Sequence, residues 1–135
     1  MAGRVWIAAG ALLAALAVTA GAMGAHVLKE KLKLPQPDLD SYDLAVRYQM
    51  YHALGLILVG ILAARGPNRL VSAAGAAFAL GIVLFSGGIY VRLATPYASI
   101  VHVVPIGGAT WIVGWLLLAA GALAGRPCSD HARRA

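Results

Sequence analysis

The sequence predicts an all-α membrane protein whose four transmembrane helices form an up-down bundle. Its composition is the first observation that predicts this fold. Hydrophobic residues make up 61% of the 135-residue chain and charged residues only 12%, whereas soluble domains carry roughly 45–50% apolar and about 25% charged residues. Because so few charges cannot keep a water-facing surface soluble, we expect most of the surface to face lipid.

The spacing of the charges is the second observation. Uncharged gaps of 24, 17, 22 and 33 residues separate, in turn, Arg4 from Lys29, Arg47 from Arg65, Arg69 from Arg92, and Arg92 from Arg126. A spanning helix needs about 20 apolar residues, and the ~10-residue alternation of a membrane β-barrel is missing. The gaps therefore predict one domain over residues 1–125, with helices near residues 5–28, 47–64, 70–91 and 105–123.

Small residues at helical spacing are the third observation. Each expected helix carries such a stripe, and a stripe of small residues lets helix backbones approach closely in lipid. Because small residues close the interior, a wide aqueous pore is disfavoured. The stripes predict tight packing of all four helices through Gly10, Ala17, Gly21, Gly24, Gly60, Gly81, Gly88, Gly114 and Gly121.

The expected connections are short and polar. Pro35 and Pro37 are expected to break the chain after the first helix, and Asp38, Asp40 and Ser41 are candidate N-caps. Helical spacing from Leu39 to Met50 leaves open an earlier start for the second helix, with its first turns in the membrane interface. Residues 65–69 and 95–97 are predicted turns.

Both ends of the chain leave alternatives open. The first helix resembles a signal peptide in its small residues, but its apolar run exceeds the 7–15 residues typical of one. Residues 126–135 are predicted to form a polar, basic tail. Its Cys128 is the one cysteine, which excludes a disulfide within the chain, and Cys128 with His131 is too small a set for a metal site.

The net charge of +6 raises the question of nucleic acid. Nucleic-acid binders gather basic residues on one face with aromatic stacking platforms, whereas here the basic residues lie between apolar runs, so no nucleic acid is expected. Six of them would lie at the end with both termini and five at the other end. The tight basic turn and the basic tail favour both termini in the cytoplasm of a bacterial inner membrane.

Polar residues inside the expected spans form a candidate polar layer near one membrane face. The layer comprises His26, Arg47, Gln49, His52, Ser86 and Tyr90, and it lies beside the start of the fourth helix at Pro105, Gly107 and Gly108. One interpretation is a hydrogen-bonded seam between helices. The other is a small-molecule or ion-handling site, because intramembrane polar groups are often functional.

Cofactor chemistry and catalysis have weaker support. His26, His52 and His102 raise the possibility of a haem- or quinone-associated redox accessory, because facing histidines in a bundle can hold haem. No cofactor and no metal is nevertheless the expectation. Ser86 has no acidic residue in the membrane to orient a base, so a nucleophilic triad cannot be built, and no enzyme is predicted.

Four ordered motifs carry a family resemblance over residues 3–125. The motifs are Gly21-Ala22-Met23-Gly24-Ala25-His26, Tyr48-Gln49-Met50-Tyr51-His52-Ala53, Leu84-Phe85-Ser86-Gly87-Gly88-Ile89-Tyr90, and Pro105-Ile106-Gly107-Gly108 followed by Gly114-Trp115. With these motifs the chain resembles the YgdD-like family of small inner-membrane proteins, and this resemblance implies a four-helix membrane protein of unknown biochemical role with no known catalytic residue. The chain departs from the family pattern at Val104, where threonine is common, and in a longer stretch at residues 29–40.

The function expected from these patterns is structural. Small-residue stripes, short loops and a lack of recognisable chemistry predict an accessory membrane component that acts through helix–helix contacts. It would be a small subunit of a larger membrane complex or associate with itself. The competing function is ligand or ion handling by the polar layer.

Overall fold

The computed structural model describes residues 2–95 and 102–124, and all of the long elements in them are helices. Four of these helices are long and apolar enough to cross a membrane, so the chain is an all-α four-helix membrane protein. The helical segments are α1 (Ala2–Met23), continued by the π-helical η1 (Gly24–Lys31); α2 (Gln36–Ala63); α3 (Arg69–Gly81), continued by the π-helical η2 (Ile82–Gly87) and by α4 (Gly88–Ala94); and α5 (Val103–Ala124).

Helix α2 begins eleven residues earlier than the main prediction of residue 47. Pro35 is its N-cap and Pro37 lies in its first turn, where a missing backbone N–H costs nothing because that group has no partner in the helix. The proline pair therefore starts this helix. Asp38, Asp40 and Ser41 lie inside α2 and do not cap it, and the Ser41 hydroxyl donates to the Pro37 carbonyl at 2.8 Å.

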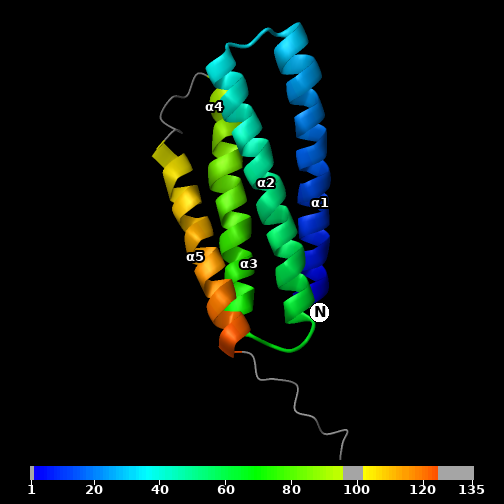
Figure 1. Cartoon of the computed structure of the whole chain (residues 1–135), viewed down its shortest axis with the longest axis vertical. Coiled ribbons are helices and arrows are strands. Elements are labelled where there is room, and N and C mark those ends of the chain that lie inside the picture. The colour runs from blue at the N-terminus through cyan, green and yellow to red at the C-terminus, as the bar shows by residue number, and fades with distance from the viewer. Residues whose placement is uncertain (1, 96–101, 125–135) are drawn as a thin grey trace, which may run out of the picture.

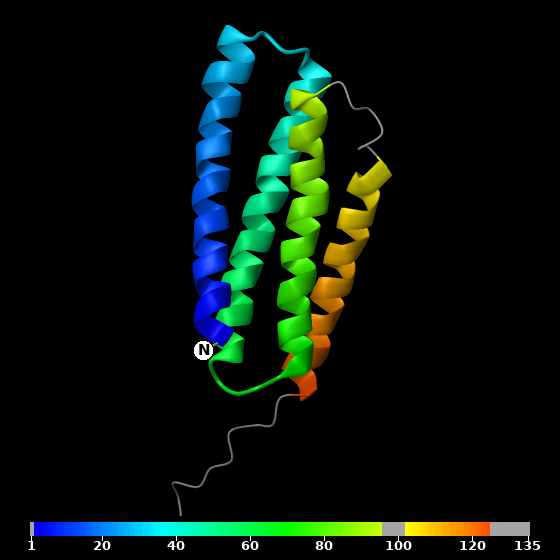
Figure 2. The same cartoon turned by 180° about the vertical axis from the view of Figure 1, so that it is seen from behind.

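The bundle has two central and two outer helices. Figures 1 and 2 show α2 and α3 in the middle, with α1 beside α2 and α5 beside α3, and the contacts between elements follow the same order. The N-terminal end of α1, the turn between α2 and α3 and the end of α5 lie at one end of the molecule (Figure 1). Predicted residues 96–97 and the 126–135 tail lie outside the described residues.

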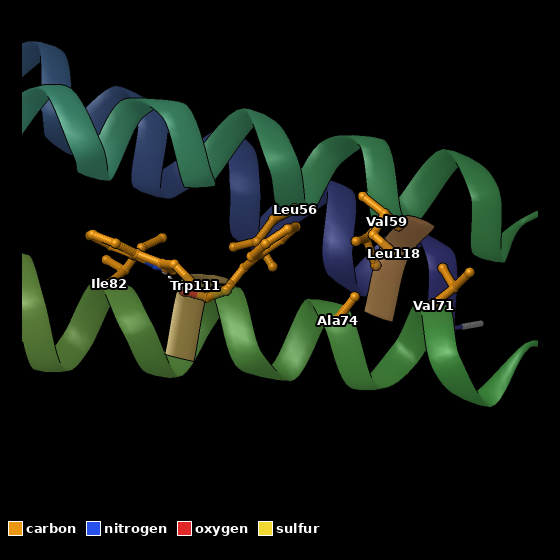
Figure 3. Close-up of a cluster of buried hydrophobic side chains, with 8 residues drawn as sticks. Leu56, Val59, Val71, Ala74, Ile82, Trp111 and Leu118 are labelled. Carbon is orange, nitrogen blue, oxygen red and sulfur yellow. Dashed lines mark hydrogen bonds between the residues drawn. The ribbon is translucent and has the colours of Figure 1, made fainter. Parts of the chain in front are cut away.

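The hydrophobic core lies between the two central helices. Val59 of α2 lies opposite Val71 and Ala74 of α3. Farther along the same cluster, Trp111 of α5 lies beside Leu56 and Ile82 (Figure 3). Phe78 is fully buried within the same cluster. Helix α5 is thus part of this core, whereas α1 borders it.

Glycines set the spacing between α1 and α2. A Cβ atom built on Gly10 would lie 2.6 Å from the Ala53 carbonyl oxygen, and one on Gly60 would lie 2.7 Å from the Gly3 carbonyl oxygen. Both distances are shorter than real Cβ contacts, so only glycine permits this approach. Ala17 is fully buried.

Glycines also seat the large rings of the bundle. A Cβ on Gly81 would lie 2.3 Å from the Trp111 ring, and one on Gly114 would lie 2.7 Å from the Phe78 ring. Farther along the bundle, a Cβ on Gly24 would lie 2.8 Å from Tyr42 and one on Gly121 2.9 Å from Val71. Gly21 has more room, at 3.6 Å from Val46, and Gly88 is buried.

Polar side chains close both ends of the bundle. The side-chain oxygen Oδ1 of Asn68 accepts hydrogen bonds from the backbone N–H groups of Leu70 and Val71, which caps α3. The Asn68 amide also donates to the Gly121 carbonyl oxygen at 2.9 Å. At the opposite end, the Arg92 guanidinium pairs with Asp38 at 3.1 Å and links α4 to the start of α2.

A candidate functional site: the polar seam

The candidate site is a group of buried or half-buried polar side chains between the helices, here called the polar seam. It adjoins the hydrophobic core, with which it shares Trp111, and extends toward the α1–α2 connection. Its members are Gln49 and His52 on α2, Ser86 on η2, Tyr90 on α4 and Trp111 on α5, and Trp115 of α5, which is 42% exposed, borders it.

Gln49 connects three helices. Its Nε2 donates to the Leu13 carbonyl oxygen of α1 at 2.9 Å, and its Oε1 accepts from the Tyr90 hydroxyl at 3.0 Å. Because Leu13 is near the middle of α1 and Gln49 near the middle of α2, this link lies well inside the span. Gln49 therefore ties α1, α2 and α4 together within the membrane.

Ser86 makes one helix-to-helix hydrogen bond. Its hydroxyl is fully buried and donates to the Ala45 carbonyl oxygen of α2 at 2.9 Å. The hydroxyl proton is directed at a carbonyl, and a carbonyl cannot act as a general base. The Ser86 bond is a structural contact, and its geometry does not activate a nucleophile.

His52 is enclosed on every side. Its ring stacks on Trp111 with centroids 3.9 Å apart and planes 3° from parallel. Its Nδ1 lies 2.8 Å from the Tyr48 carbonyl oxygen, and its Nε2 lies 3.1 Å from Trp115 Nε1. An indole N–H only donates and a carbonyl only accepts, so these partners specify the uncharged tautomer with the proton on Nδ1.

This tautomer leaves His52 no lone pair for a ligand. Iron coordination requires an open imidazole nitrogen, and the Nε2 lone pair of His52 already accepts the hydrogen bond from Trp115. His26 lies on η1 with a side chain 73% exposed, 3.9 Å from Glu30. His102 is also exposed. Of the three histidines, therefore, His52 is buried and the other two are exposed.

Several residues of the predicted polar layer lie outside the seam. Arg47 is exposed and pairs with Asp43 on its own helix at 3.0 Å. Because α2 begins at Gln36, Arg47 sits in the middle of a longer helix and points outward. Pro105 is exposed, Gly108 is half-buried, and Gly107 packs closely against Phe85 of η2. The structure therefore brings together Gln49, Ser86 and Tyr90, and places His52 near them.

The tryptophans were missing from the sequence-based set. Trp111 is 3% exposed, and its Nε1 donates to the Phe78 carbonyl oxygen at 3.2 Å. Their spacing offered a signal, because Trp111 and Trp115 are four residues apart and so share a helix face. Tyr48 and His52 have the same spacing on α2.

The seam satisfies its own hydrogen-bonding groups. Across residues 2–95 and 102–124, every buried side-chain nitrogen or oxygen has a hydrogen-bond partner. In the same part of the chain, no three His, Cys, Asp or Glu residues gather closely enough to hold a metal ion. A ligand-binding site usually presents unpaired polar groups to a cavity, and the seam does not.

Comparison with known proteins places the chain in a family. A family model described as "protein of unknown function (DUF423)" matches residues 20–108. The chain is 42% identical over 118 residues to a UPF0382 membrane protein of Staphylococcus saprophyticus, covering 87% of this chain and 96% of that protein. It is 39% identical over 122 residues to the UPF0382 membrane protein YwdK of Bacillus subtilis, covering 89% and 97%.

No solved structure gives a significant match to the chain. The names of the two relatives describe membrane proteins, which agrees with the membrane-spanning helices of this chain, and neither the family description nor these names state an activity. The chain, with its four membrane-spanning helices, belongs to the DUF423 family of proteins of unknown function.

Proposed function

We propose that this protein is a structural or accessory component of the bacterial inner membrane that acts through helix–helix contacts and catalyses no reaction. One observation carries the proposal, which is the uneven burial of the spanning helices. Only 11% of the apolar stretch of α1 is buried, compared with 44% for α2 and 39% for the helix formed by α3, η2 and α4. A helix this exposed has most of its surface available to a partner.

The outward face of α1 suits a partner helix. Ala8, Ala11, Ala15 and Ala22 are exposed and follow helical spacing, so they form a second small-residue stripe beside the one that contacts α2. In lipid, helices associate through close packing at such stripes, because lipid offers no hydrophobic drive. The partner is another membrane protein subunit or a second copy of this chain.

The closed hydrogen bonding of the seam disfavours a ligand-handling function. The polar side-chain atoms of Gln49, Ser86 and His52 are already hydrogen-bonded within the bundle, so binding a ligand there would break existing bonds. For the same reason we propose that the protein works without haem, quinone or metal. The narrower likeness to YgdD-like proteins rests on the four sequence motifs alone.

Site-specific photocrosslinking in cells tests this proposal. A photoreactive amino acid at Ala11 should yield protein-sized adducts, whereas the same group at Val83, an exposed residue of η2, should yield none. Native mass spectrometry after mild extraction should then show a partner or a second copy. A bare monomer by mass, together with no adduct at Ala11 or Ala15, would overturn the proposal.

We also propose that both termini face the cytoplasm. The end of the bundle that carries Arg4, Arg65 and Arg69 has a short turn, and positive charge near short turns favours the cytoplasmic side. In a Cys128→Ser background, an impermeant maleimide should label Lys31→Cys in spheroplasts but label Arg65→Cys only after lysis. The reverse pattern would invert the orientation.

A further inference from the structure

A cavity of about 320 Å³ lies between the end of the first spanning helix (α1 with η1) and the start of α2, outside the polar seam. We infer that it binds the headgroup of a phospholipid that carries a primary ammonium, such as phosphatidylethanolamine. Its volume is at the lower end of the range for small-molecule sites. Gly21, Gly24, Tyr42 and Val46 line its apolar part.

The cavity exists because the two helices separate toward this end. Gly10 brings α1 against α2 below, whereas the Tyr42 ring stands between the helices beside Gly24, and its hydroxyl donates to the Ala20 carbonyl oxygen at 2.9 Å. From Gly24 onward α1 becomes the π-helical η1, which widens the backbone. Inserted π-turns often occur at functional sites.

The cavity lies at the depth of lipid headgroups. Asp43 precedes Arg65 by 22 positions and Lys29 follows Arg4 by 25, so both lie ~33–38 Å along the helices from the opposite basic end. The hydrocarbon core is about 30 Å thick. Gly21 follows Arg4 by 17 positions, or ~26 Å, so the apolar part lies at the level of the acyl chains.

The charges around the cavity match a zwitterion. Lys29 supplies one cation for the phosphate, and Asp40 and Asp43 supply two carboxylates for an ammonium. Asp40 accepts a hydrogen bond of 2.7 Å from the Gln36 amide, and this neutral amide does not cancel the negative charge of the carboxylate. Arg47 pairs with one oxygen of Asp43, and the second oxygen remains an acceptor.

This arrangement selects among phospholipids. A primary ammonium donates three hydrogen bonds and can reach both carboxylates. The trimethylammonium of phosphatidylcholine has no N–H to donate. Phosphatidylglycerol carries no cation, and its negative charge would face Asp40 and Asp43.

Lipid competition followed by native mass spectrometry tests the inference. The delipidated full chain is exchanged into detergent with equal amounts of phosphatidylethanolamine, phosphatidylcholine and phosphatidylglycerol of identical acyl chains. Phosphatidylethanolamine adducts should exceed each of the others by about fivefold, the ratio that one partly hydrated charge-assisted hydrogen bond supports. Equal adduct intensities would overturn the inference.

Matched variants locate the binding. Asp40→Asn with Asp43→Asn should remove the preference, whereas Glu30→Gln, on η1 but not lining the cavity, should keep it. Lys29→Gln should weaken binding of phosphatidylethanolamine and Lys31→Gln should not. Ala25→Leu should obstruct the cavity without altering any charge, with Val18→Leu, an exposed position of α1 that does not line the cavity, as its control. Loss of the phosphatidylethanolamine preference in the control variants would contradict the assignment. Retention of the preference in both the Asp40/Asp43 double variant and Ala25→Leu would also contradict it.

Discussion

The two outer helices of this bundle are held to the central pair by different kinds of contact. Helix α5 is attached through aromatic rings, because Trp111 stacks on His52 and both of its tryptophans donate hydrogen bonds to the central helices. Helix α1 is attached through close backbone approach at Gly3, Gly10 and Gly60.

The difference shows two solutions to the same physical problem. Lipid tails are as apolar as leucine, so an outer helix gains nothing from the hydrophobic effect when it docks in a membrane. Helix α5 gains dispersion energy over large rings that fit against glycine. Helix α1 gains it from backbone contacts across a narrow stripe, which leaves its remaining surface exposed and available.

Loss of the aromatic attachment should have the largest effect. Trp111→Ala removes a ring that is 3% exposed, and a large-to-small change at such a site costs about 3–5 kcal/mol of unfolding free energy. Helix content followed by circular dichroism during an SDS titration measures the change. The control Ile112→Ala faces outward and should cost under about 1 kcal/mol. Similar losses from both variants would contradict the role of the ring.

Separating the backbones of α1 and α2 at Gly10 should have the second-largest effect on stability. A Cβ on Gly10 would meet the Ala53 carbonyl oxygen at 2.6 Å, so Gly10→Val should push α1 away and cost about 1–3 kcal/mol. The same titration, combined with cysteine crosslinking between α1 and α2, measures this separation. The neighbouring change Ala11→Val lies on the exposed face and should leave both readouts unchanged. An unchanged crosslink in the Gly10 variant would argue against a glycine-set spacing.

The Asn68 link should have an intermediate effect that separates into two parts. Asn68→Ala removes both the cap of α3 and the bond to Gly121 and should cost about 0.5–2 kcal/mol. Asn68→Ser restores a capping oxygen but no amide donor, so it should recover most of the α3 stability. Hydrogen exchange at the start of α3 and the end of α5 measures each part, and simultaneous full recovery at both places would show that the Gly121 bond contributes nothing.

Single hydrogen bonds should matter least, and equally for the two outer helices. Trp115→Phe removes the donor to His52, and Tyr42→Phe removes the donor to Ala20 of α1. Interhelical hydrogen bonds in membranes average about 0.6 kcal/mol, so each variant should lose that amount in the SDS titration. Tyr51→Phe, an exposed tyrosine, is the control. A loss several times larger for Trp115→Phe would mean that His52 depends on its partner for more than one bond.

The sequence predicted the membrane class and four spans because charge is expensive in lipid and its absence over about 20 residues is visible in one dimension. Its main prediction started the second helix at residue 47 and left an earlier start open, and α2 in fact begins at Gln36. Pro35 and Pro37 are compatible with either a helix break or a helix start, and only the observed N-cap distinguishes them. The predicted polar layer included Gln49, His52, Ser86 and Tyr90 because they are polar and were expected at a similar depth in the spans.

Only the tertiary structure decided which side chains of each span point into the bundle and which point outward. Arg47 and His26 are polar residues of the same spans as Gln49, yet they point outward, and the two tryptophans that enclose His52 come from a helix about 60 residues away in the chain. Hydrophobicity determines which segments enter the membrane. Which face of each segment turns inward depends on the fit of rings against glycines, and that fit exists only once the helices have met.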